Sequence, residues 1–146
     1  LVALVGACVE GHRAAYPAAR LRVESGVPAA PCAAVPEAIA QALDKLVANA
    51  VDFAEPGSEI VVSVDAAGRP AGWQVSVRNS GAPLPDAMSD SLFESMVSVR
   101  PDAGASSRGH LGLGLYLVRL IAEFHGGRAW ARNVAGGVEV GFSVAA

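Results

Sequence analysis

Three polar side chains share one edge of the longest helix that the sequence predicts. Lys45, Asn49 and Asp52 stand at positions i, i+4 and i+7, a spacing that aligns them along one stripe of a helix. On an isolated helix such a stripe is most simply a solvated face. The stretch Gly112-Leu113-Gly114-Leu115 opens a later helix, where unpaired backbone N–H groups and the helix dipole favour a phosphate.

A third polar element lies between these two helices. The segment Asn79-Ser80-Gly81-Ala82-Pro83 directly follows a predicted strand. A pair of glycines alone is weak evidence for a binding site. Three polar or Gly-rich elements in a fixed order are more specific, and they change the interpretation of the helix stripe from a solvated face to part of a site.

The elements that must position these residues follow from apolar periodicity. Steps of three and four predict helices, whereas alternation predicts strands. The predicted helices cover 1–16, 37–54 and 112–125, and the predicted strands cover 20–24, 60–64, 73–78, 128–133 and 138–144. Pro36 suits the first turn of the second helix. Residues 79–110 are predicted to be irregular, with one short helical piece at 87–96, and loops of that length usually serve binding sites.

Composition places the chain among folded domains of ordinary size. Its 146 residues are 52% hydrophobic and 17% charged, which predicts one folded domain over 1–146 and excludes a disordered chain. A net charge of −3, without any Lys/Arg-rich run, argues against a nucleic-acid partner. The apolar run at 1–9 is too short for a membrane span and lacks the basic start of a signal peptide. Cys8 and Cys32 lack C-x-x-C spacing, which favours free thiols in a reducing compartment.

The order of the polar elements resembles the ATP-binding catalytic domain of bacterial sensor histidine kinases, in the GHKL superfamily that also holds DNA gyrase B, Hsp90 and MutL. Residues 43–53 resemble the N box, 77–83 the first glycine box, 92–96 the F box and 112–115 the second glycine box. His125-Gly126-Gly127 also fits the family. The resemblance covers nearly the whole chain. Its F box and the stretch 110–127 are most similar to sensor kinases of proteobacterial dedicated sortase systems. It implies a two-layer α/β sandwich, the Bergerat ATP-binding fold, in which a mixed, mostly antiparallel sheet carries three helices on one face.

The resemblance also assigns tasks at the adenine side of a nucleotide. Asn79 occupies the position of the usual Asp that accepts a hydrogen bond from the adenine amino group. Gly81 would let the backbone approach the adenine, and Phe53 would pack near the nucleotide.

At the phosphate side, the resemblance implies that Asn49 is the Mg²⁺ ligand and that Arg108 is the lid arginine that meets the γ-phosphate. Arg100 is a second candidate for that contact. The second glycine box, made of Gly112, Leu113, Gly114 and Leu115, would bind phosphates at the helix start. Asn49, Lys45 and Arg108 form the expected catalytic set.

Four residues depart from the family pattern. Lys45 stands where the N box usually has Asn, and Asp52 stands where it usually has Lys. We interpret the two changes as linked: the phosphate-seeking Lys has moved to the opposite end of the stripe, while Asp52 helps hold water around Mg²⁺. The alternative is a surface ion pair. Pro83 and His110 each replace a glycine of the two glycine boxes, which bears on the nucleotide pose.

The function that the resemblance implies is transfer of the γ-phosphoryl group of Mg-ATP to a histidine on a separate dimerisation domain, in two-component signal transduction. The expected partners are that phosphoacceptor domain of the same full-length kinase, through which the protein would dimerise, and a response regulator. The expected location is a cytoplasmic domain of an inner-membrane sensor kinase. His12 has the spacing to Pro17 of a phosphoacceptor box but lies too close to the catalytic elements, so we do not interpret it as the acceptor.

Two alternatives remain open at this point. One is a GHKL-type serine kinase that acts on an anti-anti-sigma factor. The other is a catalytically inactive regulatory module that binds a nucleotide.

Overall fold

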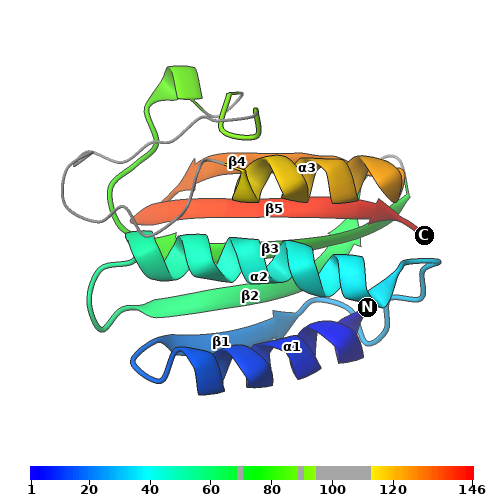
Figure 1. The fold of residues 1–146 in the computed structure, drawn as a ribbon, viewed down its shortest axis with the longest axis horizontal. Coiled ribbons are helices and arrows are strands. Elements are labelled where there is room, and N and C mark those ends of the chain that lie inside the picture. The colour runs from blue at the N-terminus through cyan, green and yellow to red at the C-terminus, as the bar shows by residue number, and fades with distance from the viewer. Residues whose placement is uncertain (69–70, 89–90, 95–112) are drawn as a thin grey trace.

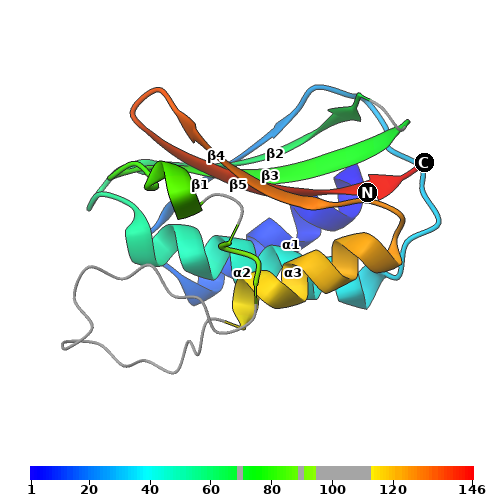
Figure 2. The same ribbon diagram turned by 90° about the horizontal axis from the view of Figure 1, so that it is seen from above.

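A mixed sheet carries the three long helices of the described residues on one face (Figures 1 and 2). The computed structural model describes residues 1–68, 71–88, 91–94 and 113–146. Within these ranges the helices are α1 (Val2–Ala15), α2 (Pro36–Phe53) and α3 (Gly114–Phe124), with a short 3-10 helix η1 at Asp86–Met88. The strands in the same ranges are β1 (Arg20–Ser25), β2 (Glu59–Ala67), β3 (Gly72–Ser80), β4 (Ala129–Val134) and β5 (Gly137–Ala145).

The strand order is β1-β2-β3-β5-β4, and only the β1–β2 pair of these strands is parallel. A parallel pair needs a crossover connection, and α2 supplies it between β1 and β2. The remaining pairs are antiparallel hairpins or neighbours. Figure 2 shows the helices below the sheet, where α1 lies under β1, α2 under β3, and α3 under β4 and β5. This is the two-layer α/β sandwich that the sequence predicts.

The core lies between the two layers. Each helix turns an apolar stripe to the sheet, and each strand contributes alternate side chains to the same layer. The most deeply buried members from the helices are Val5, Val9, Ile39, Ala42, Leu43, Leu46, Val47, Ala50, Val118 and Ala122. Those from the sheet are Val62, Val64, Val75, Val77 and Phe142. The apolar stripe of α2 thus faces the sheet, and the polar stripe of Lys45, Asn49 and Asp52 is left at its outer edge.

The predicted elements agree with the observed ones except in one segment. The predicted ends of the helices and strands fall within a few residues of the observed ends, and Pro36 begins α2. The short helix predicted at 87–96 is wrong in its described part, because η1 is a single turn that ends at Met88 and residues 91–93 form a turn. The three Ser and one Asp in the sequence of this segment favour turns over continuous helix. No helix among the described residues is long and apolar enough to span a membrane.

Two buried histidines differ in their hydrogen bonds. His125 ends α3, with its Nδ1 2.7 Å from the Ile121 carbonyl oxygen, while its Nε2 accepts a 3.0 Å hydrogen bond from the Val35 N–H. Since Nε2 accepts, Nδ1 carries the proton, and the neutral ring ties the end of α3 to the residue before α2. His12 has its Nε2 3.5 Å from an Asp44 carboxylate oxygen, and its buried Nδ1 has no hydrogen-bond partner among the described residues.

We expect the two histidines to respond differently to replacement by leucine. His125→Leu removes two hydrogen bonds, the one from the part-buried Val35 N–H and the one to the Ile121 carbonyl oxygen, and should lower the free energy of unfolding by about 1–3 kcal/mol. His12→Leu removes a buried unpaired polar atom and should stay within about 1 kcal/mol of the wild-type chain. Urea unfolding measures both values, and equal losses in the two variants would contradict the assignment.

Candidate nucleotide-binding site

Lys45 brings the N box and the second glycine box together. Lys45 lies on α2, and Gly114 is the first residue of α3. A methyl group at Gly114 would lie 3.6 Å from Lys45 Cδ, so the aliphatic part of the lysine packs against the start of α3. The Lys45 Nζ also lies 3.5 Å from an Asp44 carboxylate oxygen, and the lysine side chain is about one-third exposed. The side chain of a cationic residue therefore lies beside a helix N-terminus, which is where a phosphate would bind.

Gly81 brings the first glycine box to the end of α2. Its φ angle is 143°, and a methyl group there would lie 2.7 Å from the carbonyl oxygen of Phe53. The Gly81 N–H donates to the Gly136 carbonyl oxygen at 3.3 Å, in the turn between β4 and β5. Only glycine fits between these two neighbours, because any side chain would collide with the Phe53 backbone. Phe53 itself is 40% exposed at this end of α2.

Asn79 lies one residue before the end of β3, on the face of the sheet that carries the helices. It pairs with Val138 of β5 and is 4% exposed. Its Nδ2 donates to the Ser80 carbonyl oxygen at 2.9 Å, which fixes the orientation of the amide. The Oδ1 atom is thereby left as the acceptor, in agreement with the expected contact with an amino group.

The edge of α2 offers oxygen ligands for a hard cation. Asn49 is partly buried and makes no side-chain hydrogen bond to another described residue, while Asp52 is exposed one turn further along. The pKa of Tyr16, at the end of α1, is raised by burial and then by the carboxylates of Asp44 and Asp52. The described residues contain no group of three His, Cys, Asp or Glu side chains for a metal ion. An amide oxygen and a carboxylate nevertheless fit Mg²⁺, which usually takes one or two protein ligands beside substrate phosphates.

The remaining predicted site residues divide into two groups. Leu113 caps α3 and is 43% exposed, whereas Leu115 is partly buried against the core. Arg100, Arg108 and Gly112 lie outside the described residues. The described part of the chain therefore brings together the N box, the first glycine box and the second half of the second glycine box.

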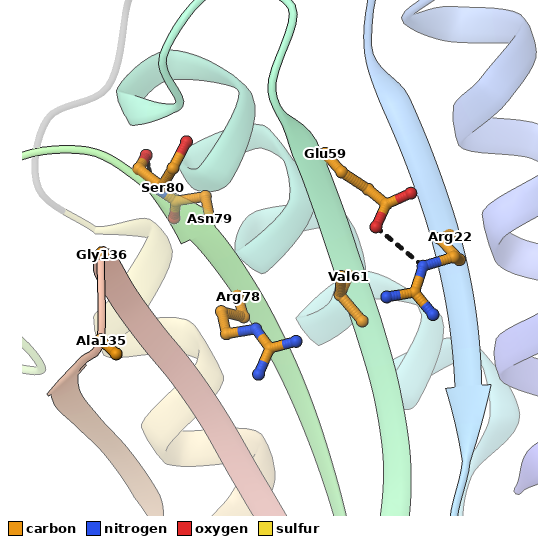
Figure 3. Close-up of a pocket in the computed structure, with 9 residues that line it drawn as sticks. Arg22, Glu59, Val61, Arg78, Asn79, Ser80, Ala135 and Gly136 are labelled. Atoms are coloured by element: carbon orange, nitrogen blue, oxygen red, sulfur yellow. Dashed lines mark hydrogen bonds and ion pairs between the residues drawn. The ribbon is translucent and has the colours of Figure 1, made fainter.

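A cavity of about 210 Å³ opens on the face of the sheet away from the helices, and Asn79 is among the residues that line it (Figure 3). Arg22 and Arg78 flank Val61 there, since Val61 pairs with both residues in the strand register. The Arg22 Nε donates to Glu59 at 2.8 Å, and hydrogen bonds from Arg22 to Glu59 and Glu24 raise the pKa of Arg22. Lys45, Asn49 and Gly114 do not line this cavity, whereas Asn79 does. The cavity therefore shares only its Asn79 side with the residues expected to bind a nucleotide.

Sequence analysis missed Asn133, which lies next to the end of β4. Its Oδ1 accepts a 2.8 Å hydrogen bond from the Leu84 N–H, and its Nδ2 donates to the Leu84 carbonyl oxygen at 2.9 Å. Leu84 follows the first glycine box, 49 residues earlier in the chain. A single Asn before a turn carries no signal of such a distant pairing, so the sequence alone could not have revealed it.

The two glycines of the site should differ in their tolerance of alanine. Gly81→Ala forces a side chain toward the Phe53 carbonyl at a positive φ angle, and we expect it to lower the free energy of unfolding by about 1–3 kcal/mol. Gly114→Ala meets only an ordinary contact with Lys45 in a helix and should leave the stability unchanged or slightly raised. Thermal unfolding of both variants tests this, and a stable Gly81→Ala variant would contradict it.

Comparison with known proteins identifies relatives of this chain among sensor histidine kinases. The sensor-type histidine kinase PrrB of Mycobacterium tuberculosis (strain H37Rv) is 32% identical over 126 residues, which are 83% of this chain and 27% of PrrB. The adaptive-response sensory kinase SasA of Prochlorococcus marinus (strain MIT 9313) is 36% identical over 91 residues, 62% of this chain and 24% of SasA. The sensor histidine kinase WalK of Bacillus subtilis is 28% identical over 98 residues, which are 67% of this chain and 16% of WalK. The chain thus spans about a quarter or less of these relatives.

Solved structures share the fold. The catalytic domain of histidine kinase ThkA superposes with a TM-score of 0.82 at 24% identity, over 99% of this chain and 91% of that one. The ATP-binding domain of PrrB from Mycobacterium tuberculosis gives a TM-score of 0.75 at 22% identity, over 99% of this chain and 92% of that one. A family model of the histidine kinase-, DNA gyrase B- and HSP90-like ATPases matches residues 34–145, which include every strand from β2 onward and both helices of the site. The chain belongs to this family of ATPases.

Proposed function

We propose that this chain is the catalytic part of a protein histidine kinase, which binds Mg-ATP and transfers the γ-phosphoryl group to a histidine of a separate domain. Membership of the ATPase family implies ATP binding. The observation that carries the proposal is the packing of Lys45 against Gly114, because it places a cation of the N box beside the start of α3. Both features favour phosphate groups.

The proposed roles follow from the chemistry of each side chain. Asn79 Oδ1 accepts a hydrogen bond from the adenine amino group, and Gly81 lets the backbone lie close to the base. Lys45 and the start of α3 contact phosphate oxygens. Asn49 and Asp52 would hold Mg²⁺, directly or through water, and the bound ion would neutralise charge on the phosphates. Sensor kinases usually have a lysine at the position of Asp52, and this chain has its lysine at position 45 instead. The edge of α2 that faces the nucleotide would thus still carry one cation.

The proposed reaction depends on positioning and charge. The γ-phosphoryl group passes in line from its bridging oxygen to a histidine nitrogen, and the residues around it hold the donor and stabilise its negative charge. Arg108, or Arg100, is the proposed cation for the γ-phosphate. No side chain of this chain needs to form a covalent bond with the nucleotide.

The proposed partners are a phosphoacceptor domain of the same full-length kinase and a response regulator. Histidine kinase ThkA has been solved in complex with the response regulator protein TrrA, and that kinase shares this fold with a TM-score of 0.77. The phosphoacceptor domain would carry the dimer contacts, in a kinase whose sensor lies in the inner membrane. Burial of His12 to 8% exposure supports an acceptor on that other domain.

The departures at Lys45 and Asp52 raise one second candidate, a regulatory module that binds the nucleotide without transferring phosphate, which the sensor-kinase relatives do not favour. Both candidates require the same site. Addition of a phosphoacceptor domain together with labelled ATP separates them, since only the kinase labels the acceptor histidine.

The test of the site is calorimetric titration with a non-hydrolysable ATP analogue, with and without Mg²⁺. We expect Mg²⁺-dependent binding that Asn49→Ala weakens by about tenfold or more, the loss of one charge-assisted ligand. Gln41→Ala, an exposed substitution on the same helix, is the matched control and should bind as the wild type does. Absence of binding to the wild-type chain would refute the proposed site.

Lys45→Ala tests the exchange of the lysine along α2. The variant should bind the ATP analogue about three- to tenfold more weakly, while its affinity for AMP changes little, because the lysine contacts the outer phosphates. Titration of both nucleotides measures the difference. Equal affinities of variant and wild type for the ATP analogue would favour a surface ion pair between Lys45 and Asp44.

A further inference from the structure

Asn133 forms hydrogen bonds with Leu84, in the segment that follows the first glycine box. Its side-chain amide makes both hydrogen bonds that the Leu84 backbone offers, one as acceptor at 2.8 Å and one as donor at 2.9 Å. Such a pair copies the two-bond exchange of neighbouring strands, although one partner is a side chain. It orients the segment as well as attracting it, because two parallel bonds fix a direction that one bond leaves free.

The strand register puts Asn133 in line with Asn79. Both residues pair with Val138, Asn79 from β3 and Asn133 from β4, so all three lie in one row across the sheet. Residues of one row point to the same face of a sheet. Asn133 therefore lies on the helix-bearing face, two strands from the proposed adenine acceptor and roughly 10 Å from it by the usual strand spacing.

The segment between Asn79 and Leu84 is held at both of its ends. At Gly81, the N–H donates to Gly136, and the Cα lies against the Phe53 carbonyl. At Leu84, the hydrogen bonds to Asn133 close the segment onto β4, and the Leu84 side chain packs against the core. The hairpin of β4 and β5 thus supplies contacts to both ends of the segment that is expected to lie along the adenine.

We infer that Asn133 is a positioning residue for the base side of the nucleotide site. Without touching the nucleotide, it holds residues 81–84, which follow the acceptor Asn79 and include the close backbone of Gly81, in place beside the base. This inference rests on the proposed function, since it assigns a support to the same site. On this assignment, β4 supports the base side of the nucleotide site, and Lys45 with α3 supports its phosphate side.

The experiment compares Asn133→Ala with the wild-type chain for an ATP analogue, ADP and AMP by calorimetry. Loss of the two hydrogen bonds should raise the dissociation constants of all three nucleotides by the same factor, about three- to tenfold. Lys45→Ala gives the opposite pattern, with a loss that grows with the number of phosphates. The Leu84 amide hydrogen should also exchange faster with solvent in Asn133→Ala.

Arg132→Ala is the matched control, because Arg132 precedes Asn133 on β4 and its side chain pairs with Glu139 and the Trp130 ring instead. It should leave the three affinities and the Leu84 exchange unchanged. Unchanged affinities in Asn133→Ala, with a wild-type chain that binds, would overturn the inference alone. A wild-type chain that binds none of the nucleotides would overturn the proposed function and this inference together.

Discussion

The burial of α2 is the constraint on which the rest of the structure depends. Ile39, Leu43 and Leu46, with their neighbours on the same face, are almost fully enclosed between the sheet and the two other helices. Burial of several such side chains contributes roughly 1.5–3 kcal/mol each, so the rotation of the helix about its axis is fixed. A fixed rotation also fixes the direction of the opposite edge. The position of Lys45 and Asn49 is thus a consequence of hydrophobic packing that contains no polar group.

Hydrogen bonds between distant segments complete what packing begins. His125 links the end of α3 to the start of α2, and Gly81 links the end of β3 to the β4–β5 turn. Each of these bonds satisfies a backbone group in a connection, where no strand or helix partner exists. The connections around the site therefore have defined courses although they contain little regular secondary structure.

The sequence predicted the elements well because their signals are local. The stripe of α2, the apolar run of β2, the alternation in β3 and the Gly-Gly end of α3 each lie within one segment. The resemblance to sensor kinases supplied the order of the boxes. The helix predicted at 87–96 is wrong in its described part, because a pattern of apolar residues there competes with turn-forming Ser and Asp. The pairing of Asn133 with Leu84 and of His125 with Val35 could not be predicted, since each joins residues far apart in the chain through single side chains.

The directions of the two site helices explain why both a cation and phosphates suit this end of the molecule. Figure 1 shows α2 and α3 side by side, with the end of α2 and the start of α3 toward the same end of the sheet. A helix carries partial negative charge at its C-terminus and partial positive charge at its N-terminus. The end of α2, with Asp52, therefore favours a cation, while the start of α3, with Lys45 beside it, favours anions. A magnesium-bound triphosphate carries both kinds of charge, so the polarity of the two helices matches it before any lid residue contributes.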